Sequence, residues 1–429
     1  MKLPLILAAL TFLDLSATAL AQGGPITMQR KSSGGWELVR DGKPFFLRGA
    51  GGHEHLDVLQ ASGGNAIRTW GIDALTATHD GLPLTERAKK HNLTIVAGLW
   101  VAHERHGFNY SDPAQVQKQR EQIRASIAKW KHESSIGIWG LGNEMEGPTA
   151  NGQDSRIWKE IEALAKIVKE EDPTRLVMTV VAGAAPAKVK GVKDHCPSID
   201  ILGVNAYASA SGAGKQVKDA GWDKPFALTE FGPSGHWEVP HTPWNAPIEP
   251  SSREKAAKYF ATQQLVAEES AGLCVGTFAF LWGQKQETTS TWYGMFLKSG
   301  EKLPAVDAVS RAWTGEWPAN RCPRIEAFSA PALASSVAPG QAVEVKLDVA
   351  DPNGDEVNLD WRIAPESTDR KEGGDHERAP EEKPLAMEAA GEKAWKFTAP
   401  QEKGAYRLFL YVRDGKDAAS AENIPFLVK

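Results

Sequence analysis

Residues 136–144, Ile-Gly-Ile-Trp-Gly-Leu-Gly-Asn-Glu, form an apolar run that ends in an amide and a carboxylate. Residues 226–232, Phe-Ala-Leu-Thr-Glu-Phe-Gly, have the same character and carry Glu230 near their end. Both runs are continuously apolar rather than alternating, which is typical of parallel strands buried on both faces. The sequence therefore predicts two parallel strands of one α/β domain, each presenting a glutamate at its carboxyl end.

Six further apolar runs of this kind occur in the first three quarters of the chain, and amphipathic stretches separate them. Ser155–Glu171 is the clearest such stretch, with apolar residues at helical spacing between Asp154 and Asp172-Pro173. Gln115–Lys131 and Arg253–Glu269 repeat the pattern. Eight strand–helix units over about 270 residues are typical of a (β/α)₈ barrel, the TIM barrel. The predicted strands are Phe45–Ala50, Asn65–Trp70, Leu93–Trp100, Ile136–Gly142, Leu176–Val181, Ile199–Asn205, Phe226–Phe231 and Val275–Trp282.

A doubly wound open sheet is the alternative to the barrel. It would require a glycine-rich phosphate turn after the first strand. The segment Gly49-Ala-Gly-Gly-His has the glycines but not the spacing of that motif. The barrel is therefore the better prediction.

The pattern changes near residue 318, where Trp317-Pro318 and Cys322-Pro323 interrupt it. Strict two-residue alternation follows, for example at Val343, Val345, Leu347 and Val349. Alternation predicts half-buried antiparallel strands, and several such strands joined by turns predict a small immunoglobulin-like sandwich. Residues 22–318 are thus assigned to the barrel and residues 324–429 to an all-β domain. Within the latter, the charged segment 366–383 has the composition of a mobile loop.

The N-terminus has the features of a secretory signal. Lys2 is followed by the apolar stretch Leu3–Leu13 and by Ala19-Leu20-Ala21, a small-x-small cleavage site. This predicts a signal peptide over residues 1–21, a mature start near Gln22, and a secreted or periplasmic protein. The stretch is too short for a membrane span. An uncleaved N-terminal anchor is the alternative.

The amino-acid composition bears on which ligands the protein binds. The 429 residues have a formal net charge of −5 and no basic cluster, so nucleic acid is not expected as a partner. The three cysteines, Cys196, Cys274 and Cys322, have no metal-ligand spacing, although one disulfide is possible in an oxidising compartment. Fifteen tryptophans suit a carbohydrate ligand, because sugars stack their C–H faces on aromatic rings.

Catalytic groups in a barrel come from the carboxyl ends of its strands. Glu144 and Glu230 would then face one cavity. Glycoside hydrolysis needs such a pair, one acid to protonate the leaving oxygen and one carboxylate to attack or to activate water. The alternative for each glutamate alone is a helix cap or an ion pair with arginine.

These motifs resemble a known group of enzymes. Asn143-Glu144 and Thr229-Glu230-Phe231-Gly232, at the predicted fourth and seventh strands, are similar to the signature of clan A, the retaining glycoside hydrolases with two glutamates on a (β/α)₈ barrel. The segments Phe45-Phe-Leu-Arg-Gly and Gly64-Asn-Ala-Ile-Arg-Thr-Trp resemble the catalytic barrels of family two β-glycosidases and of β-1,3-glucanosyltransferases. Full family two enzymes carry sandwich domains before the barrel, whereas about twenty residues precede it here. The galactosidase, glucuronidase or mannosidase specificity of those enzymes is therefore not transferred to this chain.

The resemblance implies roles for particular residues. Glu144 would be the acid/base and Glu230 the nucleophile, while Asn143 would hold the sugar 2-hydroxyl. Arg68 and Tyr207 would bind the nucleophile and keep it ionised, and Trp282 would form the floor of the −1 subsite. The remaining predicted substrate-binding residues follow other strand ends or lie in the nearby loops; they are Trp70, Trp100, His103, Asn205 and Trp237.

Two motifs offer metal binding as an alternative function. His53-x-His55 after the first strand is how metal-dependent amidohydrolase barrels begin, but the further histidines and aspartate of such a site are missing at the later strands. Asp351-x-Asn353-x-Asp355 could bind Ca²⁺, although a plain hairpin turn explains it better. No metal and no cofactor are therefore expected.

The sequence thus predicts a secreted retaining β-glycoside hydrolase that acts on an oligo- or polysaccharide, with β-glucan favoured by the glucanosyltransferase likeness. A transglycosylase on the same site is the first alternative. A non-catalytic glycan-binding protein is the second, and the presence of both glutamates with Asn143, Arg68 and Tyr207 argues against it.

Overall fold

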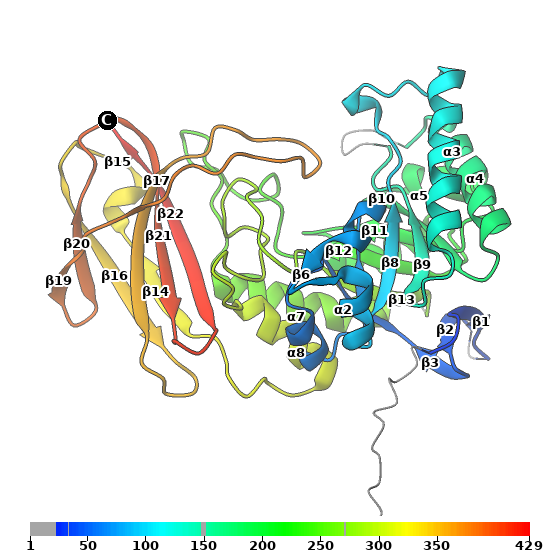
Figure 1. The fold of residues 1–429 in the computed structure, drawn as a ribbon. Coiled ribbons are helices and arrows are strands. Elements are labelled where there is room, and N and C mark those ends of the chain that lie inside the picture. The colour runs from blue at the N-terminus through cyan, green and yellow to red at the C-terminus, as the bar shows by residue number, and fades with distance from the viewer. Residues whose placement is uncertain (1–22, 33, 147–151, 270–271) are drawn as a thin grey trace, which may run out of the picture.

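The computed structural model describes residues 23–32, 34–146, 152–269 and 272–429. Eight parallel strands close into a barrel, and helices surround it (Figure 1). The predicted barrel is confirmed, and the open sheet is excluded. In spatial order the strands are β4 (Leu47–Gly51), β5 (Ala66–Arg68), β8 (Thr94–Leu99), β9 (Ile136–Leu141), β10 (Leu176–Ala182), β11 (Ile201–Asn205), β12 (Phe226–Phe231) and β13 (Cys274–Ala279), which pairs with β4.

Aspartate side chains cap two of the helices, and α4 begins at Ser155 as predicted. Asp112 accepts hydrogen bonds from the amides of Ala114 and Gln115 at the start of α3, and Asp154 accepts one from the amide of Arg156 at the start of α4. The helices are α1 (Leu56–Ala61), α2 (Leu84–Lys90), α3 (Pro113–Trp130), α4 (Ser155–Glu171), α5 (Pro186–His195), α6 (Ala213–Asp219), α7 (Ser252–Glu269) and α8 (Pro304–Thr314).

A three-stranded antiparallel sheet precedes the barrel, made of β1 (Thr27–Arg30), β2 (Trp36–Arg40) and β3 (Lys43–Phe45). Leu38 of β2 and Ile26, which directly precedes β1, pack in one core cluster with side chains of the barrel strands, such as Leu47 and Phe278. The sheet therefore belongs to the barrel domain. A short hairpin, β6 (Thr78–His79) and β7 (Leu82–Pro83), lies between β5 and α2.

The C-terminal part is an all-β domain of two sheets that pack around Trp361, Phe397 and Phe426. It confirms the expected sandwich. One sheet contains β14 (Arg324–Ser329), β16 (Ala342–Ala350), β20 (Ala394–Thr398) and β19 (Glu388–Gly391). The other contains β15 (Ser336–Val337), β22 (Ala419–Val428), β21 (Gly404–Arg413), β17 (Asn358–Pro365) and β18 (Lys383–Pro384).

The two domains share a buried interface. Leu297 and Leu303 of the barrel form one apolar cluster with Phe409, Tyr411 and Ala419 of the sandwich. The backbone continues the contact, because the Ala419 amide donates to the carbonyl of Lys302 at 2.9 Å. The sandwich therefore packs against the barrel through a buried apolar interface.

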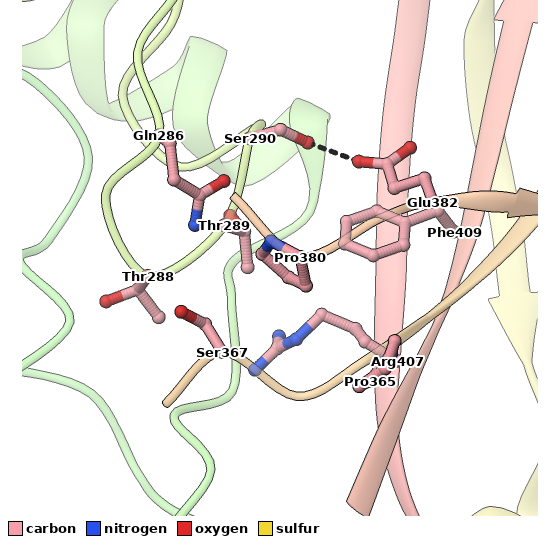
Figure 2. A pocket seen from close by; sticks show the side chains of 10 residues that line it. All are labelled: Gln286, Thr288, Thr289, Ser290, Pro365, Ser367, Pro380, Glu382, Arg407 and Phe409. Carbon is pink, nitrogen blue, oxygen red and sulfur yellow. Dashed lines mark hydrogen bonds between the residues drawn. The ribbon is translucent and has the colours of Figure 1, made fainter. Parts of the chain in front are cut away.

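The loop between β17 and β18, the charged segment that composition marked as mobile, extends from the sandwich toward the barrel (orange in Figure 1). Its two arms and the barrel segment 286–290 line one pocket, as Figure 2 shows, and Ser290 Oγ donates to Glu382 at 2.7 Å. The loop is tied to the barrel by hydrogen bonds, which the composition did not reveal.

The predicted signal peptide lies outside the described residues, since those begin at residue 23. No helix in the described part of the chain is long and apolar enough to cross a membrane. The three cysteines are free thiols, and all three are buried.

Candidate active site

Glu144 follows β9 and has an unusual backbone. Its φ of 51° lies in the left-handed region, which costs a non-glycine residue free energy and is found mostly at functional sites. Its amide donates to the carbonyl of Val180 on the neighbouring strand at 2.9 Å, and this bond holds the conformation. Its Oε1 accepts a hydrogen bond of 2.9 Å from Asn205 Nδ2. The barrel thus fixes both the backbone and the carboxyl group.

Glu230 lies in β12 and is buried. Three side chains donate to its carboxylate. Arg68 Nη1 and Trp70 Nε1 each lie 2.9 Å from Oε1, and the Tyr207 hydroxyl lies 2.8 Å from Oε2. An ionised carboxylate accepts hydrogen bonds at both oxygens, so the three donors around Glu230 suit the charged form of its side chain.

Arg68 and Asn205 join the two glutamates into one network. Arg68 Nη2 donates to Asn143 Oδ1 at 2.6 Å, while Nη1 binds Glu230. Asn205 Nδ2 donates to the same Asn143 oxygen at 3.0 Å and also binds Glu144. Asn205 is itself held by the Thr229 hydroxyl, which donates to its Oδ1 at 2.8 Å. Residues from four strand ends, those of β5, β9, β11 and β12, therefore converge on one place, as the barrel topology requires.

The two carboxyl groups differ in environment. Burial and the charge of Glu230 raise the pKa of Glu144 to about 7, and its hydrogen bond from Asn205 only partly opposes this rise. Glu144 is therefore poised to hold a proton near neutral pH, whereas Glu230 is surrounded by donors. Two neighbouring carboxyl groups with such different environments are typical of an acid/base and a nucleophile.

An aromatic cluster lies beside Glu230. Phe280, Trp292 and Tyr293 are buried, and Trp70 and Tyr207 pack against them. Burial and the charge of Glu230 raise the pKa of the Tyr207 hydroxyl well above its usual value, so the group stays protonated and donates. The Phe280 ring contacts both Trp70 (5.8 Å between centroids) and Tyr207 (6.0 Å). Phe280 is thus placed to support a sugar ring next to Glu230.

Trp282 is not part of this cluster, contrary to its predicted role as the subsite floor. It is 1% exposed, its ring meets Phe296 edge-on, and its Nε1 donates to the carbonyl of His55 at 3.2 Å. The side chain belongs to the barrel core. The strand β13 ends at Ala279, so the chain has already left the barrel at Trp282, and Phe280 occupies the position beside Glu230.

Exposed aromatic residues stand farther out. Trp100 is 44% exposed after β8, stacks on His106, and borders a groove with Phe108 and Gln115. Trp237 is 57% exposed and packs edge-on against Tyr207. The rings of Trp100 and Trp237 are thus exposed, whereas that of Trp292 is buried.

His103 is buried between Trp100 and the backbone of Asn143. Burial, Arg105 and His106 lower its pKa to about 4, so the imidazole is neutral at neutral pH. It therefore supports the segment that leads to Glu144 rather than exchanging protons with it.

Two aromatic residues of the site, Phe280 and Tyr293, were not anticipated. Tyr293 Oη is buried, and no hydrogen bond to it is found among the described residues. Phe280 lies within the eighth predicted strand, Val275–Trp282, and Tyr293 follows it, whereas the prediction assigned the subsite floor to Trp282. The order of aromatic residues after a strand does not show which ring turns inward.

The two motifs that stood as metal-binding alternatives have local explanations. His55 stacks on Phe296 at 4.1 Å between centroids, and so lies among core side chains. Asp351 accepts hydrogen bonds from the amides of Asn353 and Asp355, as in a turn. Asp351, Asp355 and Asp414 do come within 4.8 Å of one another, with Lys416 paired to Asp355 at 2.6 Å.

A comparison with protein families matches residues 81–234 to the TIM barrel domain of glycosyl hydrolases family 2. The matched segment contains both Glu144 and Glu230. No curated protein matches the chain.

Solved structures share the fold at low sequence identity. The β-glucuronidase 2 of Bacteroides uniformis has a TM-score of 0.51 and 14% identity over 94% of this chain and 48% of its own. An FMN-binding β-glucuronidase from Facaelibacterium prausnitzii has a TM-score of 0.51 and 14% identity over 94% and 59%. A family 2 β-galacturonidase from Eisenbergiella tayi has a TM-score of 0.51 and 16% identity over 68% and 54%.

The chain thus spans between about half and three fifths of the length of these structures. The fold and the family match agree with the resemblance drawn from the strand-end motifs. The barrel therefore resembles those of the clan A glycoside hydrolases, and residues 81–234 are similar to the catalytic barrel of family 2 β-glycosidases.

Proposed function

We propose that the protein is a secreted retaining β-glycoside hydrolase. The observation that carries the proposal is the network in which Arg68 and Asn205 join Glu230, Asn143 and Glu144 at the carboxyl ends of the barrel strands. A binding protein would need neither a proton-holding carboxyl nor a carboxylate with three donors on it.

The geometry supports a double displacement. Glu144, whose raised pKa keeps it protonated near pH 7, would donate its proton to the leaving oxygen. Glu230 would attack the anomeric carbon and form a glycosyl ester, which water then hydrolyses while Glu144 takes the proton back. The Tyr207 hydroxyl and the Trp70 N–H would hold Glu230 in line during the attack.

The stereochemistry of the product tests this mechanism. In retaining enzymes the two carboxyls lie about 5–5.5 Å apart, which leaves no room for water between the nucleophile and the sugar. Proton NMR of the first-formed anomer from a β-aryl glycoside should show the β-anomer. An α-anomer appearing first would contradict a double displacement.

The substrate class is proposed as β-linked glycan. The motif likeness to β-1,3-glucanosyltransferases favours β-glucan, and the solved structures named above are β-glucuronidases and a β-galacturonidase, so uronides belong in the same screen. Release of monosaccharide and oligosaccharide from β-glucans, mannans, galactans and uronides identifies the sugar. Products longer than the substrate would instead reveal transglycosylation. The signal-like N-terminus supports export, which N-terminal sequencing of the exported protein tests.

A further inference from the structure

The tip of the β17–β18 loop lies between two cations of the barrel. Arg105, after β8, reaches the carbonyl of Gly373 at 3.5 Å and Asp375 Oδ1 at 3.4 Å. Lys285, after β13, donates to the carbonyl of Gly374 at 2.7 Å. We call residues Gly373–Asp375 the clasp. It joins the loops after two barrel strands, β8 and β13, that are not neighbours in the barrel.

Glycine is required at both positions of the clasp. Gly373 and Gly374 have φ values of +60° and +72°, in the left-handed region. A Cβ added at Gly373 would lie 2.8 Å from the guanidinium of Arg105, and one at Gly374 would lie 3.0 Å from Lys285 Nζ. The backbone therefore comes as close to the two cations as it does because no side chain intervenes.

The base of the loop is fixed to the barrel segment that carries Lys285. Glu377 is 3% exposed and accepts hydrogen bonds from the amides of Thr288 (2.6 Å) and Lys371 (3.0 Å). Residues of both arms of the loop line one pocket with residues 286–290 (Figure 2). The clasp and Lys285 thus form one unit rather than a chance contact.

Lys285 lies at the edge of the candidate active site. Its Nζ is 6.0 Å from the centroid of the Phe280 ring, the ring that supports the subsite beside Glu230. It pairs with Glu287 at 2.8 Å. Burial raises the pKa of Glu287, the ion pair with Lys285 opposes this rise, and the charges of Glu377 and Glu230 add to it.

The ammonium has three N–H donors. Among the residues that the structure describes, Glu287 and the Gly374 carbonyl take two of them, which leaves the third for a group above Phe280. A lysine that is held in advance loses less conformational entropy when it binds a ligand than a free one.

We propose that the clasp makes the sandwich domain part of the substrate-binding site: it holds Lys285 over Phe280, where the ammonium donates to an oxygen of the bound sugar. The inference rests on the proposed function, because a sugar lies over Phe280 only if catalysis takes place at Glu230. The acceptor is a hydroxyl group or the carboxylate of a uronic acid. Lys285 is then a specificity-determining residue, and Gly374 is a positioning residue that acts through it.

The test compares Lys285→Met and Gly374→Val with a matched control, Gly354→Val. Gly354 also lies in the sandwich domain with φ +78°, but an added Cβ there meets nothing within 4 Å. The probes are 4-nitrophenyl β-glucoside and 4-nitrophenyl β-glucuronide. Both test variants should raise KM about tenfold or more, because a charge-assisted hydrogen bond is lost, with a smaller change in kcat. Gly354→Val should leave KM unchanged.

A double variant separates positioning from general damage. If Gly374 acts through Lys285, the combination Lys285→Met/Gly374→Val should have the KM of Lys285→Met alone. An effect confined to the glucuronide identifies a carboxylate acceptor, and equal effects on both probes identify a hydroxyl group.

The inference is overturned if the wild type is active but Lys285→Met keeps its KM. A loss of activity in Gly374→Val that Gly354→Val shares would equally refute a role for the clasp. Absence of wild-type turnover on every β-glycoside, with the folded state intact by circular dichroism, would instead refute the proposed function.

Discussion

Arg68 Nη1 lies 2.9 Å from Glu230 Oε1, and the two side chains are 3% and 7% exposed. The other nitrogen of the same guanidinium holds Asn143, the residue before Glu144. One buried arginine thereby fixes the nucleophile and the segment of the acid/base together. The position of this one side chain links the stability of the barrel to its chemistry.

Removal of Arg68 should show both effects. Arg68→Met leaves a buried carboxylate without its partner, which costs about 3–5 kcal/mol of unfolding free energy, and should lower kcat/KM by a factor of about 100 or more. Urea unfolding and aryl glycoside kinetics measure the two losses. Arg68→Met/Glu230→Leu removes both charges and should regain most of the stability while staying inactive. Failure of the double variant to recover would mean that Arg68 acts mainly through Asn143.

Azide should separate the roles of the two glutamates. Glu230→Ala removes the nucleophile and should abolish retaining turnover of every substrate. Glu144→Ala should still form the glycosyl intermediate from a dinitrophenyl glycoside, whose leaving group needs little protonation. Added azide should then release a β-glycosyl azide, which NMR identifies. Production of α-azide by Glu144→Ala and β-azide by Glu230→Ala would reverse the assignment.

The pH profile should report the raised pKa of Glu144. For a substrate with a poor leaving group, kcat/KM should fall as the pH rises through about 7, because the acid loses its proton. With a dinitrophenyl leaving group the fall should be shallower, since less protonation is needed. An identical alkaline limb for both substrates would assign that limb to another residue.

The same shift should appear in stability. The folded protein holds the Glu144 proton up to about pH 7, whereas the unfolded chain releases it near pH 4.5, so the free energy of unfolding declines over this interval as the pH rises. Glu144→Gln removes the ionisation and keeps an oxygen for Asn205. It should be more stable than the wild type at pH 8, by about 1–3 kcal/mol, and equally stable at pH 4. Denaturant titrations at the two pH values measure the difference.

Phe280 and Trp282 should respond differently to substitution. Phe280→Leu removes the ring beside Glu230 and should raise KM several-fold, with a smaller loss of stability than Trp282→Leu because Leu still fills part of the site. Trp282→Leu should instead lose about 2–4 kcal/mol of stability, because it leaves a cavity in the core, while KM at low temperature stays near the wild-type value. A large KM effect from Trp282→Leu without loss of stability would restore its predicted place in the subsite.

Truncation after residue 318 should prevent folding, although both glutamates precede that point. It would expose Leu297 and Leu303 and remove Asn423, which donates to the buried carboxylate of Glu249 at 2.6 Å. We expect the shortened chain to be insoluble. A soluble, cooperatively melting barrel would show that the domains fold independently.

The sequence by itself determined the architecture. Eight continuously apolar runs, Asp154 before α4 and the Pro-containing break near residue 318 each act through local sterics and solvent exclusion, so they predict the strands, the helix starts and the domain boundary. The convergence of Glu144 and Glu230 could also be predicted from the sequence, because residues at the carboxyl ends of the strands lie at the same edge of the barrel whatever surrounds them.

Only the tertiary structure decided which neighbours those residues have. Trp282 and Phe280 are two positions apart, and the path of the chain after β13 sends one ring into the core and the other toward Glu230. The clasp unites Gly373 with Arg105, 268 residues away, and the composition of its loop indicated only mobility. Contacts of this kind depend on how two domains dock, and no local pattern of polarity or spacing records that geometry.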